Sequence, residues 1–144
     1  IDHLTILVSG LEGEDERRNI DKIMTMLRSL VEETQCCMLL VSHLRRAGGD
    51  KGQEQGAQIS LSQLRGSHSI AQLSDAVIAL ERDQQAKDPI EANTTSVRVL
   101  KNRYAGETGI GAFLLYDTNT GRMKEINDPT QRDDFDVVDK GDYL

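Results

Sequence analysis

Aromatic residues are scarce in this chain of 144 residues, which contains 3 Tyr, 2 Phe and no Trp. A hydrophobic core must therefore be built from Ile, Leu, Val, Met and Ala. A chain of this length forms one domain at most, and it is long enough to bury such a core. No apolar run approaches the length of a transmembrane helix and no signal-peptide pattern occurs, so we expect no membrane partner.

Cysteine is rarer still, and Cys36 and Cys37 stand next to each other on an apolar run. On a strand they would point to opposite faces, so we expect packed thiols in a reducing compartment and neither a disulfide nor a metal site. The formal net charge is -7 at pH 7, but much of the acidic excess lies in residues 128–144. The rest of the chain is nearly balanced, so its cations can form local patches.

The apolar run at residues 36–43, CCMLLVSH, is the segment around which the chain is organised. Apolar runs without alternation are typical of strands covered on both faces, as in parallel sheets flanked by helices. Ile1–Ser9 is predicted to form an earlier buried strand. The spacing of apolar residues between about Asp15 and Thr34 predicts an amphipathic helix. These segments together predict a βαβ unit with parallel pairing.

The end of the run at 36–43 carries polar side chains. In open α/β sheets ligands bind beyond the carboxyl ends of the strands, so Ser42, His43 and Arg45 lie where chemistry is expected. A polar strand end that enters an ordinary surface loop is the alternative. The next segments predict a long basic, glycine-rich loop at 45–59, a capping box at 60–63 and a short helix to about 74. After these the sequence predicts a strand at 76–80, a polar loop at 83–93, a more exposed strand at 96–100 and a hairpin at 110–126.

The motifs VSHLRR, SLSQLRGSHSIAQLSD, ALERDQQ and VLKNRYAGETG follow one another in this chain. In this order and spacing they resemble the helicase domain of DnaB-type hexameric replicative helicases. The resemblance is greatest to the primase–helicases of T-seven-like bacteriophages, a group that includes the mitochondrial helicase Twinkle. It implies a RecA-like α/β fold with a mixed, mainly parallel sheet flanked by helices and a C-terminal hairpin. It also implies a ring that uses ATP or dTTP with Mg²⁺ to translocate on single-stranded DNA and unwind duplexes.

The resemblance assigns catalytic roles to several positions. Asp2 would end the Walker B strand and help to hold Mg²⁺ through its water shell, with a capping carboxylate as the alternative. His43 matches the position that senses the γ-phosphate, where a neutral imidazole loses a hydrogen bond on hydrolysis. Arg103 resembles the arginine finger and Lys101 its companion, and both are expected just beyond the strand at 96–100. A charged, exposed strand end is the alternative for these two cations.

The family's DNA-binding loop corresponds to the basic, glycine-rich segment. Arg45, Arg46 and Lys51 would supply salt-sensitive attraction to the phosphates, although an ordinary solvated loop would have the same composition. Arg65 and Gly66 match the motif that joins the DNA channel to the nucleotide site, and Arg65 could contact phosphate.

The same motif continues toward the nucleotide. Gln72 could transmit the nucleotide state, and Asp75 is expected to order the local backbone. Ala71 departs from the phage pattern, which has an arginine there. Arg82 and Tyr116 resemble the pair that sandwiches the nucleotide base, since a guanidinium plane and a phenol ring stack on any base. From composition alone, Tyr116 would be a core residue of the hairpin.

No G-x-x-x-x-G-K-[ST] phosphate loop occurs in these residues, and the family's catalytic glutamate lies upstream of Walker B. Residues 1–127 are therefore expected to be the C-terminal part of a RecA-like helicase domain without its Walker A half, inactive alone. One alternative is a non-hydrolysing module that binds single-stranded DNA or a replisome partner. Another is a recombinase-type ATPase core, which normally lacks the LRGSHSIAQLSD and KNRYAGETG motifs.

Residues 128–144 are acidic and expected to be disordered, with Phe135, Tyr143 and Leu144 as apolar positions at intervals. The phage likeness suggests that this tail docks on the replicative DNA polymerase, and a solubilising tail is the alternative. Single-stranded DNA and further copies of the chain in a hexameric ring are the other implied partners. The implied location is the cytoplasm of a phage-infected bacterial host.

Overall fold

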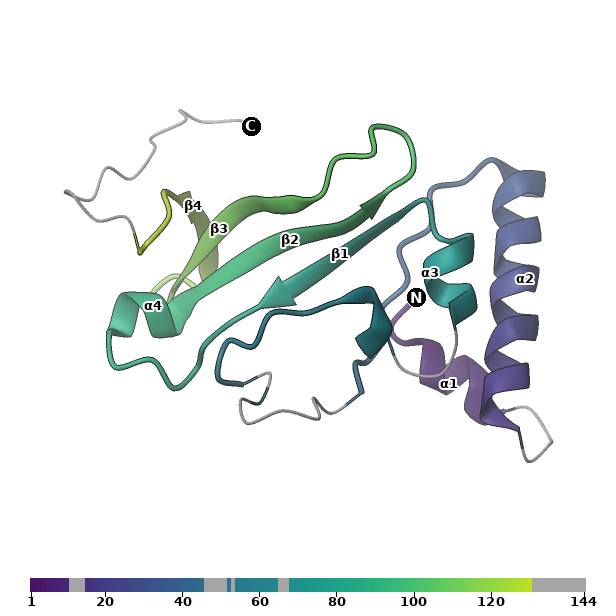
Figure 1. Ribbon diagram of the computed structural model, residues 1–144, viewed down its shortest axis with the longest axis horizontal. Helices are drawn as coiled ribbons and strands as arrows, with labels where there is room; N and C mark the ends of the chain where they lie inside the picture. The colour runs from purple at the N-terminus through teal and green to yellow at the C-terminus, as the bar shows by residue number, and fades with distance from the viewer. Residues whose placement is uncertain (11–14, 46–51, 53, 65–67, 131–144) are drawn as a thin grey trace. The chain divides into compact units, whose positions relative to one another are not determined.

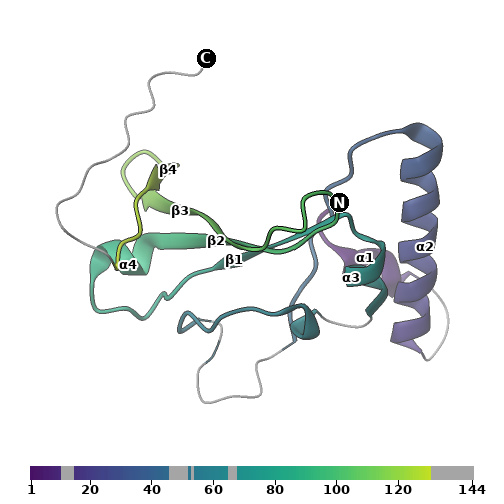
Figure 2. The ribbon, with the colours of Figure 1, turned by 45° about the horizontal axis from the view of Figure 1, so that its top comes forward.

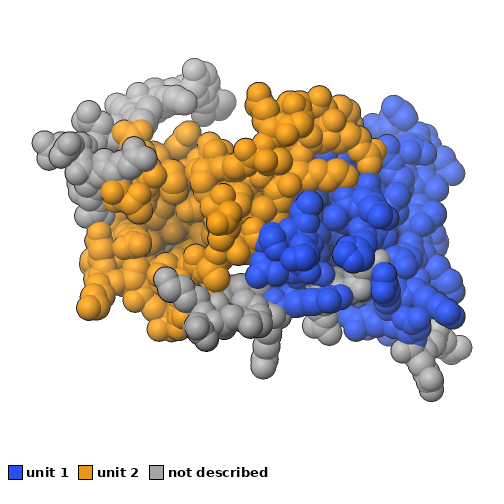
Figure 3. All heavy atoms as spheres, in the orientation of Figure 1, with its two compact units in different colours: residues 1–46, 60–77 blue, residues 47–59, 78–144 orange. Residues whose placement is uncertain are grey.

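The computed structural model describes residues 1–10, 15–45, 52, 54–64 and 68–130. The chain divides into two compact units, distinguished in Figure 3: unit 1 comprises Ile1–Arg46 and Ser60–Val77, and unit 2 comprises Ala47–Ile59 and Ile78–Leu144. Most of the expected disordered tail, from residue 131 onward, lies outside the described residues. No helix in the described part of the chain is both long and apolar enough to cross a bilayer.

The longest element of unit 1 is the helix α2, Glu16–Thr34, as the sequence predicts. Asp15 caps its start, because the carboxylate accepts hydrogen bonds from the backbone N–H groups of Arg17 and Arg18 at 3.1 and 3.2 Å. The helix ends at Gln35, which has a left-handed φ of 56° and donates its N–H to the carbonyl of Val31.

The core of unit 1 forms where α1 (Leu4–Ser9) and α3 (His68–Leu73) pack against α2 (Figures 1 and 2). Its buried side chains are Leu4, Val8, Ile20, Met24 and Ile70, with Ile23, Leu40, Leu64 and Leu73 packed around them. The 3-10 turn η1, Leu61–Gln63, precedes α3. Its predicted capping box is confirmed, since the Gln63 side chain accepts from the backbone N–H of Ser60 at 2.8 Å.

The predicted strand at Ile1–Ser9 is wrong, because α1 occupies Leu4–Ser9. Leu4 and Val8 lie one helical turn apart and both are buried, whereas Ile6 is exposed. A short apolar run fits a buried strand or a buried helix equally well, so its periodicity could not decide between them.

Residues 36–43 were also predicted to form a strand, and none is formed there. The amine of Ile1 donates to the carbonyl of Leu39 at 2.7 Å. The backbone N–H of Val41 donates to the carbonyl of Ile1 at 2.9 Å. This is the hydrogen-bonding pattern of parallel strands, but it stops because the neighbouring chain turns into α1 at Leu4. The two strands of the predicted βαβ unit are therefore not formed in the described residues, although the parallel pairing predicted between these segments is present at Ile1 and Val41.

The side chains of the same segment are not covered on both faces. Leu39 is 81% exposed, and the thiols of Cys36 and Cys37 are free and exposed. The prediction of packed thiols is wrong, because it assumed a strand buried on both faces.

Unit 2 contains most of the four-stranded sheet, in the order β1-β2-β3-β4. Its elements are β1 (Ala76–Glu81), the short helix α4 (Pro89–Asn93), β2 (Thr94–Asn102), β3 (Gly109–Asp117) and β4 (Arg122–Ile126). The pairs β2/β3 and β3/β4 are antiparallel, and Figure 1 shows β1 and β2 running in opposite directions. A mainly parallel sheet is thus not confirmed in the described residues, whereas the C-terminal hairpin is.

Alternate side chains of β1 are open to solvent. Ile78 and Leu80 are 60% and 65% exposed, whereas Ala79 and Glu81 are buried. This alternation is the period of a strand covered on one face.

The helix α4 lies in the segment predicted to be a polar loop. Asp88 caps it by accepting from the N–H of Ile90 at 3.0 Å, and Pro89 occupies its first turn. Asp followed by Pro is a helix-start signal, so the sequence did contain the information.

Candidate functional site

In unit 1 the segments that carry the predicted residues Asp2 and His43 are joined by backbone hydrogen bonds, since the N–H of Val41 donates to the carbonyl of Ile1. His43 is exposed, and its ring meets that of His3 edge to face, with the centroids 4.2 Å apart and the planes at 61°. The sequence assigned His3 no part in the site. The half-buried His3 ring has an Nδ1 atom that is shielded from solvent and makes no hydrogen bond with any described residue.

Asp2, directly before His3 in the chain, provides one exposed carboxylate. Mg²⁺ prefers oxygen ligands and keeps several waters, so one carboxylate together with substrate phosphates is a sufficient donor set. The described residues contain no group of three or more His, Cys, Asp or Glu side chains able to enclose a metal. A single carboxylate of this kind fits Mg²⁺ that arrives with a nucleotide.

Arg45 is the described member of the predicted DNA-binding set. It is exposed, and its backbone N–H donates to the carbonyl of Gln63 at 2.8 Å. An isolated bridge between Leu44 and Leu64 lies beside this bond, so the start of the basic loop is fixed against the η1 segment. The other members, Arg46, Lys51, Arg65 and Gly66, lie outside the described residues.

The residues around α3 are tied to α2. Gln72 is exposed on α3, while Asp75 follows its end and accepts from Arg28 Nη1 at 2.8 Å. Arg28 also donates from Nε to Glu32 at 2.8 Å. Hydrogen bonding to Glu32 first and to Asp75 second raises the pKa of Arg28 above its ordinary value. The ion pair with Arg28 thus joins Asp75, which lies between α3 and β1, to α2.

Arg82 follows β1, and its guanidinium is held by the end of α4. Nε donates to the carbonyl of Ala92 at 2.7 Å and Nη2 donates to Asn93 Oδ1 at 3.1 Å. Hydrogen bonds lie in the guanidinium plane, so they fix its orientation and leave its faces available for stacking. Tyr116, the predicted partner of Arg82, is half-buried on β3, two strands from β1 in the sheet order.

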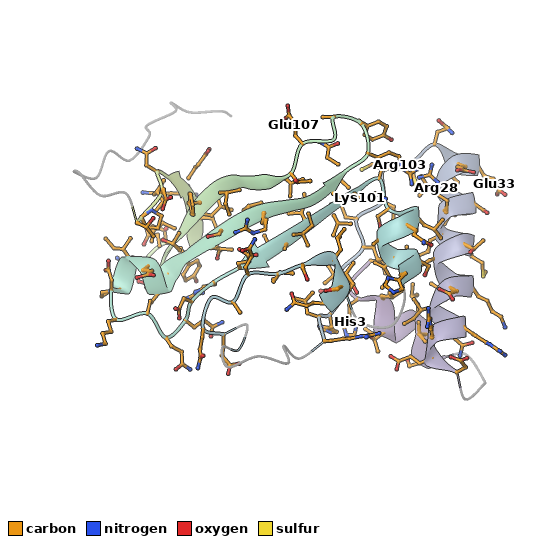
Figure 4. All side chains as sticks on the ribbon, viewed as in Figure 1. His3, Arg28, Glu33, Lys101, Arg103 and Glu107 are labelled. Carbon is orange, nitrogen blue, oxygen red and sulfur yellow. The ribbon has the colours of Figure 1, made fainter. Side chains whose placement is uncertain are left out.

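Lys101 and Arg103 lie at the end of β2, next to the connection that carries Glu107 (Figure 4). The strand continues to Asn102, so Lys101 is inside it and not beyond it as predicted. Arg103 is exposed at the start of the turn. The side chain of Asn102 accepts from the N–H groups of the two residues after Arg103 at 3.1 and 3.2 Å, which fixes the turn around it.

The predicted site residues are therefore divided between the two units. Unit 1 carries Asp2, His43, Arg45 and Gln72, and unit 2 carries Arg82, Lys101, Arg103 and Tyr116.

In a comparison with known protein families, the model of the DnaB-like helicase C-terminal domain matches residues 1–125. The chain is 41% identical to a DNA helicase/primase of Enterobacteria phage T3 over 124 residues, which are 86% of this chain and 21% of that protein. It is 33% identical to the replicative DNA helicase DnaB of Leifsonia xyli subsp. xyli over 106 residues, which are 72% of this chain and 22% of that protein. The chain thus spans about a fifth of the length of these curated relatives.

Among solved structures, an ATPase domain matches with a TM-score of 0.63 at 22% sequence identity. The match covers 79% of this chain and 39% of that one. The fold is therefore RecA-like, although the described sheet is antiparallel.

Proposed function

Because this chain belongs to the DnaB-like helicase C-terminal domain family, we propose that it is part of a ring-shaped motor that couples nucleoside triphosphate hydrolysis to DNA unwinding. The observation that carries the proposal is the family match over residues 1–125, which includes every residue that we assign to catalysis, nucleotide binding or DNA binding. The exposed, turn-held position of Arg103 supports the same role.

At the phosphates, Asp2 would hold Mg²⁺, which supplies charge neutralisation to the transferring phosphoryl group. His43 would sense the γ-phosphate and report its loss to the basic loop that follows it in the chain. Arg103, with Lys101, would reach a nucleotide bound by a neighbouring subunit and stabilise the developing charge.

At the base of the nucleotide, we propose that Arg82 and Tyr116 stack on the ring system and that Gln72 transmits the nucleotide state. The in-plane hydrogen bonds of Arg82 to α4 support stacking, since they hold the guanidinium plane in place. Stacking accepts any base, which is consistent with either ATP or dTTP as the substrate.

For partners, we propose single-stranded DNA at Arg45, Arg46 and Lys51, together with Arg65 and Gly66, inside a hexameric ring. We further propose that the acidic residues 128–144 dock on a replicative DNA polymerase, and that the protein acts in the cytoplasm of a phage-infected bacterial host. The DNA contacts would be largely electrostatic, because cations on a glycine-rich backbone follow phosphates without reading bases.

The present residues contain no phosphate-loop motif, so we propose that they do not hydrolyse nucleotide alone. A second candidate is a module that binds single-stranded DNA or a replisome partner without hydrolysis. The two candidates differ in the full-length protein, where only the motor should show hydrolysis stimulated by single-stranded DNA.

The test measures nucleotide hydrolysis and strand separation by the full-length protein, with and without single-stranded DNA. Arg103→Ala should reduce turnover by roughly 10³-fold or more while nucleotide binding stays within a few-fold, because an arginine finger acts on the transition state. Arg122→Ala on β4 is the matched control and should retain activity. A full-length protein that binds single-stranded DNA but hydrolyses nothing would support the binding module instead.

A further inference from the structure

Glu81, the last residue of β1, is a buried carboxylate that joins two other segments of unit 2. It is 8% exposed. Its Oε1 accepts from the backbone N–H of Ile59 at 2.8 Å. Nε of Arg98 donates to Oε1 and Oε2 at 2.9 and 3.1 Å. A buried charge needs both a counter-charge and hydrogen bonds, and Glu81 has both.

Ile59 ends an arm, residues 54–59, by which the chain returns from the basic loop. The arm runs along the segment after β1, where Gln55 forms an antiparallel bridge with Asp83. Gly56 has a φ of 70°, and a Cβ atom there would lie 2.9 Å from Cβ of Asp83. The arm therefore lies too close to Asp83 for any side chain at this position, and its place on the sheet is fixed.

Arg98 lies at an irregularity of β2. Val97 pairs with Ala112 but Arg98 pairs with Ile110, so Gly111 of β3 is left without a partner residue. A β-bulge of this kind bends the strand and redirects the neighbouring side chain. At this bulge the guanidinium of Arg98 binds Glu81 on the adjacent strand.

We propose that Glu81 and Arg98 are a positioning pair that couples the basic loop to the end of β2, which carries Arg103. The inference rests on the proposed function of the loop and of Arg103. One carboxylate holds the return arm through Ile59 and holds β2 through Arg98 just before its catalytic end. A movement of the arm when DNA binds is therefore transmitted to the strand that presents Arg103.

The test measures how strongly single-stranded DNA stimulates hydrolysis by the full-length protein, as the ratio of turnover with DNA to turnover without it. Glu81→Gln keeps an acceptor for Ile59 and removes the charge. We expect it to lower the ratio at least about fivefold, the lower end of common coupling between sites. Arg98→Gln should do the same, and the double variant should lose little more, because the two residues act as one unit.

Gly56→Ala tests the arm without touching the ion pair. The added methyl group must push the arm from Asp83, so the ratio should fall here as well. Gly121→Ala is the matched control: its φ of 69° imposes the same backbone strain, but the new atom would only make an ordinary 3.9 Å contact. It should leave the ratio within about twofold, well under common coupling between sites.

The outcomes separate this inference from the proposed function. If the wild-type protein shows no hydrolysis stimulated by single-stranded DNA, the proposed function itself is wrong. If it does, but the Glu81, Arg98 and Gly56 variants lower both turnovers and the melting temperature together with an unchanged ratio, the pair only stabilises the fold. If the Glu81 or Arg98 variants fail to assemble, the stimulation ratio of Gly56→Ala tests the inference, because the ion pair is intact in that variant.

Discussion

The imidazole ring of His3 stands edge to face against that of His43, with 4.2 Å between the ring centroids. A ring packed in this way limits the positions open to His43, whose own side chain is exposed. His3 follows Asp2 directly, so one short segment presents the proposed metal ligand and supports the proposed phosphate sensor.

This contact makes a prediction for the full-length protein. His43→Ala should reduce DNA-stimulated turnover by roughly 10²-fold, the cost of losing one donor to developing charge. His3→Ala should reduce kcat less and leave KM nearly unchanged, and His3→Phe should recover much of the loss because it restores the ring edge. Steady-state kinetics measure both constants. His68→Ala, on the exposed surface of α3, is the control, and equal effects of Phe and Ala at position 3 would contradict a packing role.

A second prediction concerns Arg45 and DNA. If its guanidinium neutralises one phosphate, Arg45→Ala should lower the slope of log affinity against log salt by roughly 0.7, the value for one contact to a single strand. Titrations of single-stranded DNA at several salt concentrations measure the slope. Arg17→Ala, in the first turn of α2, removes an exposed cation of the same kind and should leave the slope unchanged. If Arg45→Ala has the same slope as the wild-type protein, Arg45 does not contact a DNA phosphate.

A third prediction concerns the proposed ring. If Arg103 acts on a nucleotide bound by a neighbouring subunit, then Asp2 and Arg103 of one subunit serve two different nucleotide sites. Rings mixed from Asp2→Ala and Arg103→Ala subunits should then regain part of the activity that each variant lacks. Arg103→Lys should rescue poorly, because it lacks the planar fork of donors. Mixed rings that assemble but stay inactive at every ratio would mean that Arg103 acts within its own subunit.

A fourth prediction concerns the turn between β3 and β4. The N–H of Asn119 donates to Asp117 at 2.9 Å, and this bond, followed by one from Thr120, lowers the pKa of Asp117 below its ordinary value of 3.8. Because the folded-state pKa is the lower one, the stabilisation is fully present above pH 3.8 and is lost as the pH falls through the lowered pKa. At neutral pH the wild-type protein should therefore melt at a higher temperature than Asp117→Asn, and this difference should become smaller in acid. Asp117→Ala should stay destabilised at every pH, and a constant difference between wild type and Asn would contradict the shift.

Much of the fold could be predicted from side-chain spacing. The helix α2 and the hairpin of β3 and β4 carry long periodic patterns and explicit turn signals, and both are confirmed. The short apolar runs at the start of the chain and at 36–43 were misassigned, because such runs have no distinct period. Residues 36–43 also depend on long-range partners, because their backbone hydrogen bonds are made with Ile1 and Leu4.

Residues of the candidate site could be assigned from the sequence where a motif specifies them. Residues whose contacts depend on the three-dimensional fold could not. Asp2, His43 and Arg103 were assigned to the proposed site through their motifs, and all three have exposed side chains in the structure. His3 was missed, because its contact with His43 joins residues far apart in the sequence and follows no spacing rule. The Glu81–Arg98 pair was missed for the same reason: in sequence it is an acidic residue and a basic residue on separate strands.

The exposed face of β1 has a consequence for handling these residues in isolation. Ile78 and Leu80 point to solvent, and β1 is the first strand in the sheet order, without a further strand beyond it in the described part of the chain. An edge strand with an exposed apolar face is a template on which other extended chains add. Purified as 144 residues alone, the protein should therefore self-associate and precipitate as its concentration rises, and a lysine in place of Ile78 should keep it in solution.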